Sequence, residues 1–144
     1  IQAYSPWTLS PEAFDAFAGS YEEDHRQSIR ASGEDPAYFH DYKLACLRRK
    51  GVDETAPLLD FGCGIGNLTT RFVTRFAEVH AYDPSAVSME KARERAPKAI
   101  FHDTHATLPR GHFETIVLSG VLHHVDPRAR IDLVTEVRSL LRPG

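Results

Sequence analysis

The 144 residues of the chain are enough for one domain and too few for two independent ones. Hydrophobic residues make up 42% and charged residues 26%, which excludes a disordered or low-complexity chain and predicts a buried core. The formal net charge of -3 gives no support for a nucleic-acid partner or an acidic membrane surface, so we expect neither.

The two cysteines, Cys46 and Cys63, match neither the paired spacing of a zinc site nor a disulfide framework. Sparse thiols are typical of a reducing compartment, so we predict a cytoplasmic protein. No apolar run approaches the roughly 20 residues that a membrane span requires. The chain starts without Met or a signal-peptide pattern and ends on the turn signal Arg142-Pro143-Gly144, so we expect a piece of a longer protein.

Residues 1–51 predict an N-terminal helical arm. Ser10-Pro11 is a helix-start signal, and aromatic residues follow it at helical spacing. After a turn over residues 31–36, a second helix is expected from Tyr38 to Lys50, ending at Gly51. The aromatic residues of the first helix are Phe14, Phe17 and Tyr21.

From residue 52 to residue 144, short apolar runs alternate with amphipathic segments. This order predicts repeated strand–helix units around a parallel sheet. The predicted fold class is therefore α/β, a Rossmann-like parallel sheet flanked by helices. The runs cover residues 58–61, 79–82, 100–102 and 115–118.

Three helices are expected between and after these runs. Leu68, Phe72 and Phe76 share one face of the first, and Ser85 caps a second that stops before Pro97. A last helix begins at Asp126-Pro127, with the acid as cap. It is expected to point Leu133, Val134, Val137 and Leu141 inward.

Three glycines, Gly62, Gly64 and Gly66, follow the first apolar run and precede a predicted helix. In this context a glycine loop lets a nucleotide cofactor approach the backbone closely. A plain tight turn is the alternative, because glycine adopts positive φ at little cost.

Asp83 ends the second apolar run, close to the spacing of about 20 residues at which a ribose-binding carboxylate follows such a loop. A carboxylate there can accept hydrogen bonds from both ribose hydroxyls. The alternative role of Asp83 is to cap the next helix.

Two details bear on which nucleotide binds. The spacing is Gly-x-Gly-x-Gly and not the Gly-x-Gly-x-x-Gly of dinucleotide sites. Asp60 ends an otherwise apolar strand, where its charge would repel a pyrophosphate and attract a cation. A ligand with an ammonium and a sulfonium fits better than a dinucleotide.

At these residues the chain resembles the class I S-adenosylmethionine-dependent methyltransferases, whose first motif has the form of residues 59–66. Residues 121–127 are similar to the family's segment after the fourth strand, and residues 137–144 to its Arg-Pro-Gly turn before the fifth. The resemblance implies S-adenosyl-L-methionine as cofactor and an enzyme that methylates a small-molecule acceptor.

The resemblance also implies contacts to the methionine and ribose moieties. Asp60 and the loop backbone at Gly62 and Gly64 would hold the methionine moiety, and Asp83 would hold the ribose.

For the adenine amino group, the resemblance implies Asp103. This residue lies one position farther from Leu108-Pro109 than the common pattern, so Thr104 can occupy the place instead, and a solvated acid at a strand end is the other interpretation. Gly66 and Ser119 complete the predicted cofactor-binding set.

His123 and His124 are the candidate catalytic residues, because they follow the fourth apolar run, at the side where open α/β sheets bind ligands. Methyl transfer needs chiefly alignment, with a base added when the acceptor must lose a proton. His123 matches the position of a general base in some small-molecule O-methyltransferases. The alternative is a structural or substrate-lining histidine.

No metal site is predicted, because two histidine groups lack a recognised ligand spacing on a defined element. Solvated loop histidines are the simpler interpretation. The groups are His102, Asp103 and His105, and His123, His124 and Asp126.

The family's sheet continues after the Arg-Pro-Gly turn, and this sequence supplies no such strands. The fold is therefore expected to lack its C-terminal strands and to expose the edge of the fourth strand, where self-association can occur. Two other functions stay open: an NAD-dependent oxidoreductase and a non-catalytic cofactor-binding module.

Overall fold

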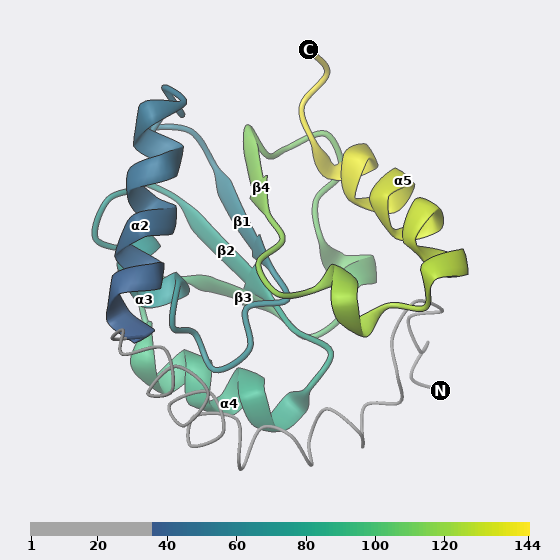
Figure 1. Cartoon of the computed structure of the whole chain (residues 1–144), viewed down its shortest axis with the longest axis horizontal. Helices are drawn as coiled ribbons and strands as arrows, with labels where there is room; N and C mark the ends of the chain where they lie inside the picture. Colours follow the sequence, from purple (N-terminus) through teal and green to yellow (C-terminus); the bar gives the residue numbers. More distant parts are fainter. Residues whose placement is uncertain (1–35) are drawn as a thin grey trace.

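The computed structural model describes residues 36–144, and the predicted helix that begins at Pro11 lies outside this part. The described residues form one parallel sheet with helices on both faces, as Figure 1 shows. The strands are β1 (Leu58–Phe61), β2 (Val79–Tyr82), β3 (Ile100–His102) and β4 (Thr115–Val117).

The sheet order is β3-β2-β1-β4, and every neighbouring pair is parallel. The predicted α/β, Rossmann-like class is thus confirmed, with β4 one residue shorter than its apolar run. The helices are α2 (Pro36–Arg49), α3 (Thr69–Phe72), α4 (Ala86–Arg95) and α5 (Arg130–Leu140), with short 3-10 helices η1 (His105–Thr107), η2 (Leu122–His124) and η3 (Pro127–Ala129).

Each face of the sheet carries its own buried cluster. Side chains of successive strand residues point to opposite faces, so Leu59 packs toward α5 while Leu58 packs toward α2 and α3. Met89 of α4 packs with Ala81 of β2. The cluster under α5 includes Leu59, Phe61, Tyr82, Phe113, Leu133, Val137 and Leu140.

The predicted inward face of α5 is partly wrong. Leu133 and Val137 are buried as expected, but Val134 is 51% exposed. At 3.6 residues per turn, positions 133, 137 and 140 lie on one side, and position 134 is turned about 100° away from 133. Leu140 completes the buried face, while Leu141 follows the helix and forms a bridge with Phe113.

The helix-start predictions hold where the structure describes them. Ser85 accepts a hydrogen bond from the Ser88 amide at 3.1 Å and caps α4. Asp126 accepts from the Arg128 amide at 2.9 Å and caps η3, which leads directly into α5. Short polar side chains at these positions satisfy amides that the first helical turn leaves without a partner.

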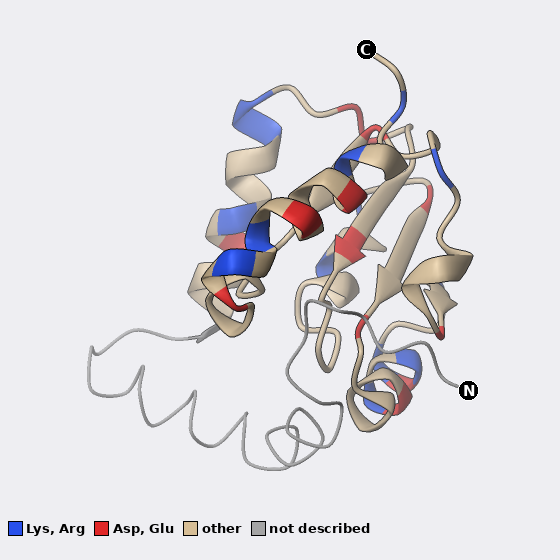
Figure 2. Ribbon diagram, turned by 90° about the vertical axis from the view of Figure 1, so that its right-hand side faces the viewer, with Lys and Arg blue, Asp and Glu red and all other residues tan. Residues whose placement is uncertain are grey.

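Residues of both charge signs lie along α5, which Figure 2 colours blue and red. No helix within residues 36–144 combines the length and the apolar character needed to cross a membrane.

Candidate functional site

The candidate site lies where the winding of the sheet reverses. β2 and β3 lie on one side of β1, and β4 lies on the other. In open α/β sheets, ligands bind at the carboxyl ends of the strands at this switch point. The glycine loop follows β1, Asp83 follows β2, and residues 119–125 follow β4, so three predicted parts of the site meet at one edge.

The amide groups of the glycine loop point into the protein. Gly62 and Cys63 donate to the Tyr82 carbonyl oxygen at 2.7 and 3.0 Å, and Gly64 donates to Asp83 Oδ2 at 2.8 Å. Gly66 donates to the Cys63 carbonyl at 3.0 Å. All three glycine amides therefore have acceptors within the protein, and the loop is fixed to the end of β2.

The glycines are required for two close approaches. A Cβ at Gly62 would lie 2.3 Å from Val121 Cγ2, and one at Gly66 would lie 3.1 Å from Ala92 of α4. Both residues have positive φ, which side-chain-bearing residues rarely adopt. A Cβ at Gly64 meets nothing within 4 Å, so open space faces the middle of the loop.

Asp60, predicted to hold the methionine moiety, is almost fully buried behind this loop. Thr69 Oγ1 donates to Asp60 Oδ2 at 2.8 Å. Burial raises the pKa of Asp60 to about 7, and the nearby Asp83 adds to that rise. The Thr69 hydrogen bond and the charge of Lys43 act in the opposite direction. Burial therefore disfavours the charged form of Asp60, and a cation beside the carboxyl would stabilise that form.

Asp83 joins the loop to α4. Its second carboxylate oxygen, Oδ1, accepts from the Ser85 amide at 2.9 Å while Oδ2 holds Gly64. The cap of α4 is Ser85, so the alternative interpretation of Asp83 as the helix cap is not what the structure shows. The residue is partly exposed at the carboxyl end of β2.

The two adenine candidates differ in their surroundings. The Asp103 side chain is 86% exposed and pairs with Arg93 of α4 at 2.5 Å. Thr104 caps η1 by accepting from the Ala106 amide at 3.3 Å. Both follow β3 at the same edge of the sheet as Asp83, and their proposed contact with adenine stays a prediction.

The segment after β4 carries the remaining candidates. Ser119 is half-buried and accepts a hydrogen bond from Lys43 Nζ at 2.7 Å. His123 is exposed and His124 is half-buried, with ring centroids 3.8 Å apart. Burial and the neighbouring His123 lower the pKa of His124. Both histidines lie on the segment after β4, and Val121 of the same segment packs against Gly62.

Lys43 and Thr69 belong to the site but were not predicted from the sequence. Lys43 lies on α2 and reaches across to Ser119, 76 positions away along the chain. Thr69 starts α3 and contacts Asp60. A lysine on an amphipathic helix is ordinary, so only the packing of α2 against the sheet could have identified Lys43.

The strand order and the glycine loop define a Rossmann-like α/β domain, and comparison with known proteins identifies its family. The family model described as "Methyltransferase domain" matches residues 58–144, and the chain belongs to this family.

Three similar proteins illustrate the relationship. An uncharacterized methyltransferase of Geobacillus kaustophilus (strain HTA426) is 30% identical over 148 residues, covering 100% of this chain and 62% of the relative. A trans-aconitate 2-methyltransferase of Mycobacterium ulcerans (strain Agy99) is 32% identical, covering 68% of this chain and 37% of the relative. The crystal structure of magnesium protoporphyrin IX methyltransferase from Synechocystis PCC 6803 with bound SAM matches with a TM-score of 0.69 at 19% identity, covering 95% and 74% of the two chains. The chain thus spans 37% to 62% of the length of these two curated relatives.

Proposed function

We propose that the protein transfers a methyl group from S-adenosyl-L-methionine to a small-molecule acceptor. The observation that carries this proposal is that the glycine amides of the loop already donate hydrogen bonds within the protein. A pyrophosphate needs amide donors, yet the three glycine amides already donate to protein acceptors. Two carboxylates, Asp60 and Asp83, lie at the same edge, which suits a ligand with positive charge.

The residues present fit such a cofactor. A carboxylate has about four acceptor sites, so Asp83 can accept from the loop, from α4 and from ribose hydroxyls together. The open space at Gly64 gives room for the methionine moiety, with Asp60 behind the loop to favour its ammonium. Lys43 offers a cation beside Ser119 for the carboxylate of that moiety. Asp103 or Thr104 remains the candidate for adenine.

The bound cofactor would supply an activated methyl group on a sulfonium. The protein then has to align the acceptor for in-line displacement and exclude competing water. His123, exposed on the segment after β4, can take a proton from a hydroxyl acceptor, and His124 beside it can orient that ring.

A small acceptor is favoured by two observations. Relatives include trans-aconitate 2-methyltransferases, which are named for a small carboxylic acid. The formal net charge of -3 gives no support for a nucleic-acid acceptor, and α5 carries two acidic residues as well as two arginines. The free thiols of Cys46 and Cys63 agree with a cytoplasmic location, which we include in the proposal.

Calorimetric titration tests the cofactor assignment. The full chain is titrated separately with S-adenosylmethionine, S-adenosylhomocysteine and NAD. We expect both sulfur ligands to bind more tightly than NAD. Equal or tighter binding of NAD would support the oxidoreductase alternative instead, and turnover of an acceptor panel would separate an enzyme from a binding module.

A further inference from the structure

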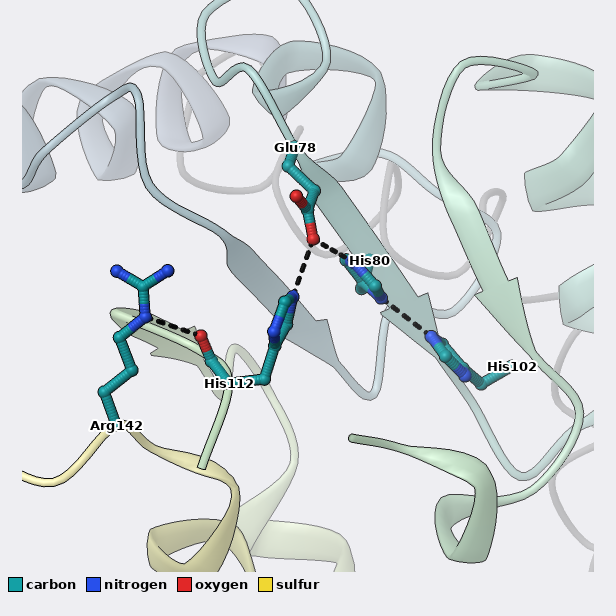
Figure 3. A network of polar contacts seen from close by, with 5 residues as sticks. All are labelled: Glu78, His80, His102, His112 and Arg142. Carbon is teal, nitrogen blue, oxygen red and sulfur yellow. Dashed lines mark hydrogen bonds and ion pairs between the residues drawn. The ribbon is translucent and has the colours of Figure 1, made fainter. Parts of the chain in front are cut away.

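A second cluster of ligand-type side chains lies at the opposite edge of the sheet. Glu78 immediately precedes β2, His80 lies within β2, and His112 precedes β4. The two imidazole Nε2 atoms approach the same carboxylate oxygen, Glu78 Oε1, at 2.8 Å from His80 and 2.7 Å from His112. Figure 3 shows the three side chains converging from two separate segments.

This amino-edge cluster, Glu78, His80 and His112, is separate from the proposed cofactor site. Five residues of extended strand separate Glu78 from Asp83, which is about 16 Å at 3.3 Å per residue. Because parallel strands keep their amino ends together, the cluster cannot share a ligand with the glycine loop.

His80 has a polar partner at each ring nitrogen. Its Nδ1 lies 2.8 Å from His102 Nε2, and its Nε2 lies 2.8 Å from Glu78 Oε1. The ring is therefore held from both sides, with Nε2 directed at the carboxylate that His112 also contacts.

We propose that Glu78, His80 and His112 bind a divalent transition-metal ion, with Zn²⁺ as the representative ligand. Two imidazoles and one carboxylate form a set that Zn²⁺ binds with a water in the fourth position. Their ligand atoms all lie within 4.8 Å of one another. Tetrahedral bonds of about 2.0 Å separate ligand atoms by about 3.3 Å, so the oxygen–nitrogen distances need to open by about half an ångström.

The surroundings suit a metal centre. Glu78 and His112 are 39% and 36% exposed, so an ion can enter from solvent, while His80 is 7% exposed and fixed in the core. His80 makes its second ring contact with His102, the kind of outer partner that orients a metal-binding imidazole. Phe113 packs edge-on against the rings of both His80 and His112.

The metal would act as a structural link. His112 is bound through its backbone to the end of α5, since its amide donates to the Leu140 carbonyl at 3.0 Å and its carbonyl accepts from Arg142 Nε at 2.9 Å. An ion shared by His80 and His112 therefore joins β2 to the segment before β4, which is hydrogen-bonded to the end of α5. This inference departs from the sequence-based expectation of no metal and does not depend on the proposed methyltransferase activity.

Zinc binding to the full chain is the direct test. Metal-stripped protein is titrated with ZnSO₄ in competition with a chromophoric chelator, and Co²⁺ is used in parallel for its visible absorption. We expect one Zn²⁺ per chain at the cluster. His112→Ala and Glu78→Gln should each weaken that binding by more than about 100-fold, beyond the 10–100-fold typical of outer-shell losses.

The controls separate this cluster from other histidines and from unfolding. The double variant His123→Ala/His124→Ala removes the other adjacent histidine pair and should leave zinc affinity unchanged. Circular dichroism establishes that the His112 and Glu78 variants are folded, and both side chains are partly exposed, which favours that result. No zinc binding by the parent chain, or unchanged affinity in folded His112→Ala and Glu78→Gln, would overturn the proposal and leave hydrogen bonds alone to hold the cluster together.

Discussion

At the scale of single residues, Asp60 links stability to pH. Its carboxyl has a raised pKa of about 7 in the folded protein, against 3.8 for an ordinary Asp. Between these values the folded state holds a proton that the unfolded state has lost, so stability rises as the pH falls from about 7 to about 4. The stabilisation that the protonated Asp60 carboxyl provides is lost as the pH rises through its pKa of about 7 in the folded protein.

Asp60→Asn tests this directly, because the amide cannot ionise. Relative to the parent, the variant should gain roughly 1 kcal/mol for each pH unit between about pH 5 and pH 7, since only the parent loses stability there. Urea unfolding at several pH values measures the difference. A difference that stays constant across this range would show that Asp60 titrates normally.

Asp83 contributes to the proposed cofactor site and to the loop. We expect Asp83→Ala to weaken the binding of S-adenosylhomocysteine by about 1–3 kcal/mol, because the ribose hydroxyls lose a charged acceptor. Asp103→Ala is a matched control at the end of the next strand, and its exposed position predicts a smaller loss. Calorimetry gives the dissociation constant of each variant. An unchanged constant for Asp83→Ala would mean that this residue only holds Gly64 in place.

His123 is the residue on which acid–base chemistry depends. If the acceptor is a hydroxyl, His123→Ala should lower kcat by about 10²–10⁴-fold while cofactor affinity is preserved. His124→Ala should do less, because that ring is half-buried beside His123. Release of S-adenosylhomocysteine with a panel of small acceptors gives the rates. Near-normal turnover of His123→Ala would leave alignment as the whole mechanism.

At the scale of elements, local pattern predicted most of the fold. Apolar runs identified the four strands that the structure describes within residues 36–144, and Ser85 and Asp126 predicted two helix starts that the structure has. Val134 was misassigned because adjacent apolar residues on a helix do not share a face. Lys43 and the Glu78–His80–His112 cluster could not be predicted, because their contacts join segments far apart in the sequence.

The contact between the glycine loop and the segment after β4 makes a prediction at this scale. In Gly62→Ala the new Cβ meets Val121 at 2.3 Å and the residue keeps a positive φ, so the loss of stability should be about 1–3 kcal/mol. Gly64→Ala is the matched control, because its φ is also positive but no atom lies within 4 Å.

Urea unfolding of both variants measures the difference. Adding Val121→Ala to Gly62→Ala should recover part of the loss, giving an interaction energy of at least about 0.5 kcal/mol. Equal losses for Gly62→Ala and Gly64→Ala would mean that backbone conformation alone accounts for the effect.

At the scale of the whole molecule, the parallel sheet separates two proposed binding edges. The carboxyl edge carries the glycine loop, Asp83 and residues 119–125, and the amino edge carries Glu78 and His112. Each ligand should therefore slow amide hydrogen exchange at its own edge, for those amides that exchange by local opening. When a ligand binds only the closed state and its concentration is about 100 times its Kd, exchange of these amides slows by about 100-fold.

Hydrogen exchange read out by mass spectrometry resolves the two edges. S-adenosylhomocysteine should protect residues 62–67, 83–85 and 119–125 while leaving 110–114 unchanged, and Zn²⁺ should do the reverse. NAD at the same concentration should protect neither. Each ligand serves as the control for the other, because protection of the same peptides by both would contradict the separation of the two sites by the length of a strand.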